Sequence, residues 1–333
     1  MLETTRAAEA PPDFLRGIIA PMYTPVHGDG SLDEEGAAEM VRWLAACGCV
    51  RTLFARSGMG RMFSFTMEET LRFAAAVKAA LPPGMGLLVG AGGEWLEHER
   101  GGRPDARRYT EQAIELTRWA AGAGADGAVH VIPYGLEPRP GETARDTVLR
   151  HYREVHDATD LPLVLYQPGG VPEEYRVTPG LLEKLLAMPR IAGMKVSTEE
   201  DAVFTPLAEV VRGTRFALIC GHEGYYARGL PQGGVGVIGQ GCNGYPEVLD
   251  GVQRRFHAGD RAGSARAQED VQRGLDATSG LHSAVALKQY IARKGYRVGP
   301  ADRGGGEPYP PEVIDRLERA LDTLRAQYRA GSA

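Results

Sequence analysis

The sequence is poor in cysteine. Its 333 residues include four cysteines, Cys47, Cys49, Cys220 and Cys242, which show neither CxxC spacing nor a neighbouring cluster of histidines. This pattern disfavours a disulfide framework or a zinc site and is typical of buried free thiols in a reducing compartment. We therefore expect a cytoplasmic protein.

Long apolar runs and a strong net charge are also lacking. No stretch of about 18 consecutive apolar residues occurs, so no membrane span is expected. The formal net charge is only -5, with both signs interspersed, which offers no basic stripe to nucleic acid. The polar segment 1–14 lacks the apolar core of a signal peptide, and we expect it to be a disordered lead-in.

What the sequence does contain is a regular alternation of short apolar runs with longer segments of helical periodicity. No GxGxxG follows the first apolar run, so the alternation favours an α/β fold of the closed (β/α)8 TIM-barrel type over an open doubly wound sheet. The eight predicted strands are 17–22, 51–55, 86–91, 127–132, 161–166, 191–195, 215–220 and 234–238. The predicted helices are 33–46, 66–80, 109–123, 144–158, 178–188, 206–212, 223–230 and 245–258.

We expect the barrel to span 15–258 and a helical C-terminal extension to occupy 259–333. Within this extension a Gly- and Pro-rich stretch, 299–311, interrupts the helical pattern. In a barrel the active site lies at the carboxyl ends of the strands, so residues there are the candidates for chemistry.

Lys195 ends an apolar strand and is one of only five lysines in the chain. An ammonium inside a barrel is costly unless it is paired or deprotonated, and a deprotonated lysine is a nucleophile for carbonyl carbon. This position suits Schiff-base chemistry, although a lysine salt-bridged at the barrel rim fits the spacing equally well. Tyr166 ends the preceding strand, where its phenol could shuttle protons near Lys195. A half-buried tyrosine bonded to backbone is the alternative.

Six segments match, in consistent order, the pattern of a known family. They are GIIAPMYTP at 17–25, LVGAG at 88–92, GADGAVHVIPY at 124–134, LPLVLYQP at 161–168, IAGMK at 191–195 and GGVGVIGQGCNGYP at 233–246. With them the chain resembles the dihydrodipicolinate synthase and N-acetylneuraminate lyase family, Schiff-base-forming barrel enzymes, over roughly residues 15–325. The resemblance implies the barrel, Lys195 as the Schiff-base lysine, Tyr166 as the catalytic tyrosine, no cofactor, and a homotetramer or dimer.

The chain departs from that family in the loop after the second strand. The family's Gly-Thr-Thr-Gly-Glu is replaced by SGMGR at 57–61, so the usual threonine hydroxyls are gone. The backbone amides of Gly58 and Met59 could still hold the carboxylate of a 2-oxo acid. Ser57 is a candidate for a displaced hydroxyl.

Two further family residues have no counterpart. The tyrosine that often follows the position of Tyr134 is Gly135 here, and the arginine that grips the second substrate's carboxylate has no match in 169–171, with Arg176 only a distant substitute. These losses argue against authentic dihydrodipicolinate synthase activity. Tyr134 itself remains a candidate for the pocket.

Other candidates lie around the variable side of the pocket. Arg56 and Arg61 bracket the loop after the second strand and could face an anionic group, or could equally serve as a helix cap or an intersubunit ion pair. The segment 94–105 adds about a dozen residues to the family pattern and could form a lid, an oligomer contact or mobile surface. The remaining candidates for the pocket are His222, Glu223, Gln240 and Asn243.

His222 and Glu223 could do acid–base work or cap the next helix. Strand ends carry no histidine or glutamate cluster of metal-site spacing, so neither a metal nor a class II aldolase is expected. The sequence thus predicts a lyase or aldolase acting on pyruvate or a related 2-oxo acid by C–C cleavage or condensation. A 2-keto sugar-acid dehydratase using the same imine, or a catalytically impaired binding or regulatory barrel, are the alternatives.

Overall fold

Eight short apolar segments form parallel strands, and each strand pairs with the next along the chain until the last pairs with the first. The structure is a computed structural model that describes residues 10–329. The strands are β1 (Gly17–Pro21), β2 (Val50–Ala55), β3 (Gly86–Gly90), β4 (Gly127–Val131), β5 (Leu163–Gln167), β6 (Ile191–Val196), β7 (Ala217–Cys220) and β8 (Gly236–Val237). The closed barrel confirms the fold predicted from the alternation.

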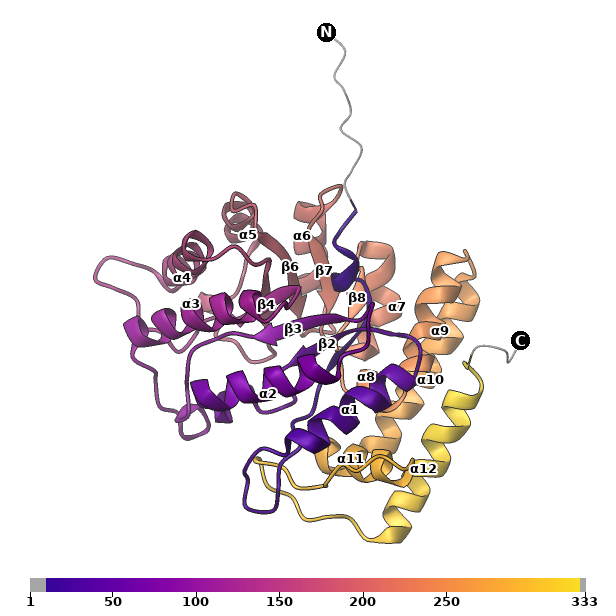
Figure 1. Cartoon of the computed structure of the whole chain (residues 1–333). Helices are drawn as coiled ribbons and strands as arrows, with labels where there is room; N and C mark the ends of the chain where they lie inside the picture. Colours follow the sequence, from indigo (N-terminus) through magenta and orange to yellow (C-terminus); the bar gives the residue numbers. More distant parts are fainter. Residues whose placement is uncertain (1–9, 330–333) are drawn as a thin grey trace.

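Helices surround the barrel (Figure 1). Those between successive strands are α1 (Glu34–Ala46), α2 (Met67–Ala80), α3 (Ala106–Gly122), α4 (Ala144–Ala158), α5 (Pro179–Leu186), α6 (Asp201–Val211) and the short α7 (Tyr226–Gly229). After β8 come α8 (Gly241–Gly244), α9 (Pro246–His257), α10 (Arg261–Thr278), α11 (Ser283–Arg293) and α12 (Pro311–Ala326).

The burial pattern explains why these segments form strands. Nearly every strand residue is buried, because each strand has the barrel interior on one side and helices on the other. One apolar cluster fills the barrel with side chains such as Ile19, Phe54, Leu88, Val129 and Val164. A second and larger cluster lies between the strands and the helices.

The helices begin where side chains can cap them. The side chains of Thr66 and Thr143 each accept a hydrogen bond from the backbone N–H three residues on. The carboxylates of Glu69 and Asp146 in turn accept one from the backbone N–H of the capping threonine, which completes two capping boxes. Helix α6 differs from the predicted 206–212, since it begins at Asp201 and contains Pro206. Proline favours a first-turn position, but here the preceding turn is already helical.

The chain is already ordered before the predicted barrel start at residue 15. A 3-10 helix covers Asp13–Leu15, and Leu15 is fully buried in the cluster inside the barrel. Residues 1–9 of the predicted lead-in lie outside the described residues. Among the C-terminal helices, α10 packs against α9 and α12, and α11 packs against α8 and α12.

Two fully buried histidines lie between the barrel wall and its helices. His130 is on β4 and His151 is on α4, and their ring centres are 6.1 Å apart. His130 is hydrogen-bonded to Thr117, and His151 is hydrogen-bonded to Thr110. Burial lowers the pKa of His151 to about 3 and holds the pKa of His130 well below its usual value. Both rings are therefore neutral in the folded state at mildly acidic pH.

We expect this pair to make the fold acid-sensitive. Below pH ~6.5 the two histidines bind protons in the unfolded chain but stay neutral in the folded protein. Each histidine therefore lowers the free energy of unfolding by about 2 kcal/mol at pH 5 relative to pH 7.5. Urea denaturation at both pH values should show a loss about 2 kcal/mol smaller in His151→Gln than in the wild type. The exposed His27, replaced by glutamine, is the control. An equal loss in all three proteins would contradict this assignment.

Candidate active site

Lys195 and Tyr166 lie side by side on neighbouring strands. They are direct partners in the β5–β6 register, and Lys195 Nζ lies 4.1 Å from the centre of the Tyr166 ring. Both are buried, Lys195 with 3% and Tyr166 with 8% of its surface exposed. The strands place an amine and a phenol together at the end of the barrel where catalytic groups gather.

The loop after β2 lies against this pair. A Cβ atom on Gly58 would lie only 2.9 Å from Tyr166 Oη, so the phenol sits directly on the glycine backbone. Any side chain at this position would displace the phenol. Glycine here lets the backbone approach the site closely, as a backbone anion cradle requires.

The Ser57 hydroxyl is used within the same loop. Its Oγ donates to the carbonyl of Met22 at 3.0 Å and accepts from the amide of Gly60 at 3.0 Å. Ser57 is fully buried. The structure thus gives this hydroxyl a part in holding the turn, rather than a place beside Tyr166.

Arg56 is buried beneath the loop, with 1% of its surface exposed. Its guanidinium donates to the backbone carbonyls of Met62, Gly90, Gly92 and Gly93. Burial lowers its pKa to about 10. These bonds hold Arg56 at a φ of +50°, a value that non-glycine residues seldom adopt. They direct the side chain into the protein, where it forms no part of the cavity that lies above Tyr166.

A cavity of about 760 Å³ opens above Tyr166. Of the candidates named from the sequence, it gathers Gly58, Met59, Arg61, Tyr134 and Tyr166. The other lining residues are Met62, Phe63, Ser64, His98, Glu99, Val131, Pro168 and Gly169. The sequence did not single out Phe63 or His98.

The segment 94–105, expected from the sequence to be an insertion, builds one wall of this cavity. Trp95 is buried, its indole Nε1 donates to the carbonyl of Gly102 at 2.6 Å, and its ring meets Phe63 edge-on at 5.1 Å. A Cβ atom on Gly135 would lie 2.6 Å from that indole. Trp95 thus occupies the space that a side chain at position 135 would need. A tryptophan within 94–105 and a glycine at 135 are the signal that the sequence offered, although the sequence pattern alone did not connect them.

Arg61 connects the cavity to the C-terminal segment. Its guanidinium contacts Asp302 at 3.3 Å, Glu99 at 3.2 Å and His282 Nε2 at 3.2 Å. Asp302 is buried, with 2% of its side chain exposed, and it also lies 3.8 Å from the fully buried Lys288. The positive charge of Arg61 is therefore balanced within the protein.

The neighbouring Arg303 fastens the same loop. Its guanidinium makes a two-pronged ion pair with Glu69 of α2 and donates to the carbonyl of Ser64 at 2.8 Å and that of Gly30 at 3.0 Å. Residues more than two hundred positions apart in the sequence thus lie together. Through Arg303, the predicted C-terminal extension thus acts as a clamp, holding in place the loop that borders Tyr166.

The remaining candidates lie apart from this cavity. Glu223 is buried and accepts from the amide of Gly241 at 2.8 Å, and Asn243 donates to the carbonyl of Pro21 at 3.0 Å. His222 and Gln240 border a separate shallow pocket, where Gln240 donates to Thr278. Arg176 donates to the carbonyl of Val171 at 2.9 Å and does not line the cavity above Tyr166.

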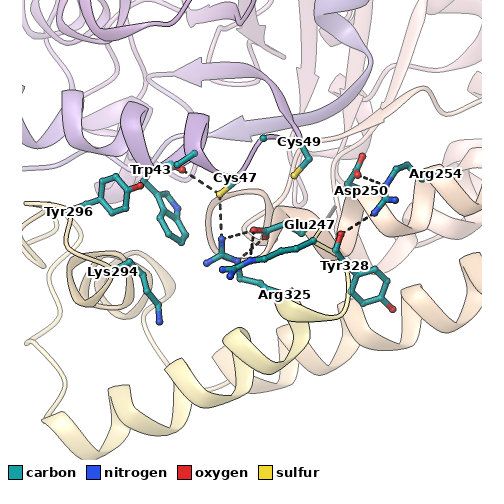
Figure 2. A pocket seen from close by; sticks show the side chains of 13 residues that line it. Trp43, Cys47, Cys49, Glu247, Asp250, Arg254, Lys294, Tyr296, Arg325 and Tyr328 are labelled. Carbon is teal, nitrogen blue, oxygen red and sulfur yellow. Dashed lines mark hydrogen bonds and ion pairs between the residues drawn. The ribbon is translucent and has the colours of Figure 1, made fainter. Parts of the chain in front are cut away.

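A second cavity, of about 530 Å³, lies outside the barrel between α1, α9 and α12. Figure 2 shows two ion pairs among its lining residues, Arg325 with Glu247 and Arg254 with Asp250. Lys294, which also lines it, pairs with Glu318 and Asp322. Burial raises the pKa of Cys47, which lines it, to about 12. Paired charges and protonated thiols leave this cavity without an evident catalytic group.

Metal-ligating clusters and membrane-spanning helices are both absent from residues 10–329. Within this range no group of three or more His, Cys, Asp or Glu side chains is placed to hold a metal ion. In the same range, every helix is too short or too polar to span a bilayer.

Comparisons with known proteins show the family and the fold of the chain. The model of the dihydrodipicolinate synthetase family matches residues 14–322. A 4-hydroxy-tetrahydrodipicolinate synthase of Methanoculleus marisnigri is 27% identical over 290 residues, 86% of this chain and 92% of that protein. The 4-hydroxy-tetrahydrodipicolinate synthase 1 of Streptomyces coelicolor is 29% identical over 302 residues, 89% of each chain.

Solved structures share the fold. A prophage protein of E. coli K12 from the dihydrodipicolinic acid synthase family, solved with pyruvate, has a TM-score of 0.78 and 24% identity, covering 93% of this chain and 98% of its own. The sialic acid aldolase of Ruminococcus gnavus has a TM-score of 0.80 and 15% identity, covering 95% and 99%. At these identities the likeness shows the same barrel architecture.

Proposed function

The chain belongs to the dihydrodipicolinate synthetase family, and from that premise we propose that it is a Schiff-base-forming lyase or aldolase acting on pyruvate or a related 2-oxo acid. The observation that carries this proposal is the buried amine of Lys195 lying 4.1 Å above the Tyr166 ring. A buried amine beside a phenol is costly in a protein that only binds ligands, but a covalent carbonyl mechanism needs both groups.

Each group has a defined part in the reaction. Lys195 Nζ attacks the keto carbon, and loss of water gives an imine that accepts the electron pair of a neighbouring C–C or C–H bond. Tyr166 gives and takes the protons of these steps. The backbone amides of Gly58 and Met59, in the loop that touches the phenol, hold the carboxylate.

The same loop separates this activity from that of the synthases among the relatives. Ser57 is used to hold the turn, and the cavity offers no arginine where a second carboxylate would bind after Tyr166. We therefore propose a reaction on a 2-oxo acid with a different second reactant, carried out by a homo-oligomer, either a tetramer or a dimer.

Borohydride reduction with pyruvate tests the imine directly. We expect the mass of one reduced pyruvate adduct on the peptide that contains Lys195. The peptide containing Lys288 is an internal control, because burial lowers the pKa of that lysine to about 8 while its Nζ bonds the carbonyls of Thr24 and Ala301, away from the cavity. No adduct with pyruvate or with larger 2-oxo acids would reject the mechanism and favour a binding protein.

A further inference from the structure

The wall built by the inserted segment carries a titratable pair. His98 Nε2 and Tyr134 Oη share a hydrogen bond of 2.7 Å, and both residues line the cavity above Tyr166. The His98 ring stacks on Phe63 at 4.0 Å, and the edge of Trp95 meets it at 4.5 Å. Two aromatic contacts and one hydrogen bond thus fix the histidine in the wall of the cavity.

The protonation states of this pair suit proton transfer. Partial burial lowers the pKa of His98, which keeps the imidazole neutral near pH 7. Burial raises the pKa of Tyr134 to about 12, which keeps its phenol protonated. Tyr134 can therefore donate its proton into the cavity, and the partly exposed ring of His98 can restore it from solvent.

The charges around the cavity cancel. Among the described residues that line it, the ionic side chains other than His98 are Arg61 and Glu99. They pair with each other at 3.2 Å, and Arg61 also contacts Asp302. A reactant that brings a second carboxylate would meet no unbalanced positive charge on this wall and would lose its hydration.

The rest of the wall is flat and apolar. Phe63, Tyr134, Met59 and Val131 line the cavity, and the indole of Trp95 packs against Phe63 and Tyr134. Surfaces of this kind bind aromatic or compact aliphatic groups by stacking and burial.

We propose that His98 and Tyr134 are the acid–base pair for the oxygen of the second reactant, which is an uncharged aldehyde with a flat apolar body. This inference rests on the proposed function. It assigns to the inserted segment both a recognition surface and a catalytic group, in a chain that lacks the threonine hydroxyls of its family.

The step balances as an aldol addition. Tyr166 gives its proton to the water that leaves as the imine forms, and its phenolate then takes a methyl proton from the imine of pyruvate with Lys195. The resulting enamine forms a bond from its terminal carbon to the aldehyde carbon. The electron pair of the aldehyde C=O moves to its oxygen, which takes the Tyr134 proton. His98 then reprotonates Tyr134, and water releases a 4-hydroxy-2-oxo acid from Lys195. Cleavage runs through the same steps in reverse.

The wild-type enzyme tests the choice of reactant without any substitution. With pyruvate fixed, kcat/KM is measured for benzaldehyde and for succinic semialdehyde, a neutral and an anionic aldehyde. We expect benzaldehyde to be preferred by about tenfold or more, the factor that one unpaired polar group costs. Equal use of both aldehydes, or a preference for the anion, would overturn the assignment of the wall.

Substitution of His98 tests the acid–base pair. His98→Gln keeps a hydrogen-bonding group near Tyr134 but cannot titrate, so kcat should fall by about 10²-fold while the borohydride adduct with pyruvate forms as before. His27→Gln, an exposed histidine, should change neither readout. An unchanged kcat in His98→Gln would remove His98 from the mechanism, and loss of the pyruvate adduct in the wild type would instead reject the Schiff base itself.

Discussion

Lys195→Met is expected to lower kcat on the order of 10⁴-fold or more, as loss of a covalent nucleophile does in other enzymes. Methionine has a similar length and an apolar character, so it should fill the same buried position between β5 and β7 without forming an imine. Single-turnover kinetics with pyruvate and the preferred aldehyde, together with borohydride trapping, provide the measurement.

The same substitution should leave the free energy of unfolding unchanged or raise it by about 1 kcal/mol, because it replaces a buried amine, which is costly to desolvate, with an apolar side chain. Tyr166→Phe is the matched variant. Tyr166→Phe should still form the adduct with pyruvate, and its kcat should fall by about 10²–10⁴-fold. Full turnover in Lys195→Met would show that another amine carries the reaction.

Glu247→Gln is expected to reduce the free energy of unfolding by about 3–5 kcal/mol. Glu247 on α9 binds Arg325 on α12 through both oxygens, at 2.6 and 2.8 Å, and their side chains are only 6% and 3% exposed. Burial alone would lower the pKa of Arg325, but the bonds from Glu247 raise it above its usual value. The substitution thus leaves a cation buried without its counter-ion.

Two comparisons separate charge from packing in this experiment. The double variant Glu247→Leu with Arg325→Met removes both charges and should cost far less than the single variant. Glu111→Gln breaks the exposed pair with Arg107, which has 61% and 86% side-chain exposure, and should change stability by less than about 1 kcal/mol. Equal losses in the single and double variants, measured by urea denaturation, would show that packing alone holds α12 to α9.

The barrel could be predicted from the sequence because each strand is a short apolar run bounded at its ends by residues that favour turns, such as Gly, Pro or Asp. Predicted and observed strand ends differ by only one or two residues, as for 161–166 against Leu163–Gln167. Register followed from strand order, which placed Lys195 next to Tyr166. Helix α6 shows where such reasoning fails, since Pro206 was interpreted as a helix start and lies inside the helix.

The cavity was less predictable because its walls come from tertiary contacts that have no local pattern. The charges of Arg56 and Arg61 made both residues candidates for an anion site, a helix cap or an ion pair. The structure gives Arg56 four backbone carbonyls as partners and gives Arg61 the side chains of Asp302, Glu99 and His282. The contact between Trp95 and Gly135 joins positions forty residues apart, and neither residue alone indicates it. Glu223 and Asn243 were expected in the pocket from their position at strand ends, and the structure turns both toward backbone groups.

The clamp by Arg303 has a consequence for protein synthesis. Glu69 and Arg303 are 234 positions apart, so at ribosomal speeds of about 5–20 residues per second the loop waits roughly 10–50 s for its partner. A nascent chain can complete all eight strands while that loop is still unfastened. The loop that borders Tyr166 is therefore fastened only after the whole barrel sequence has been synthesised.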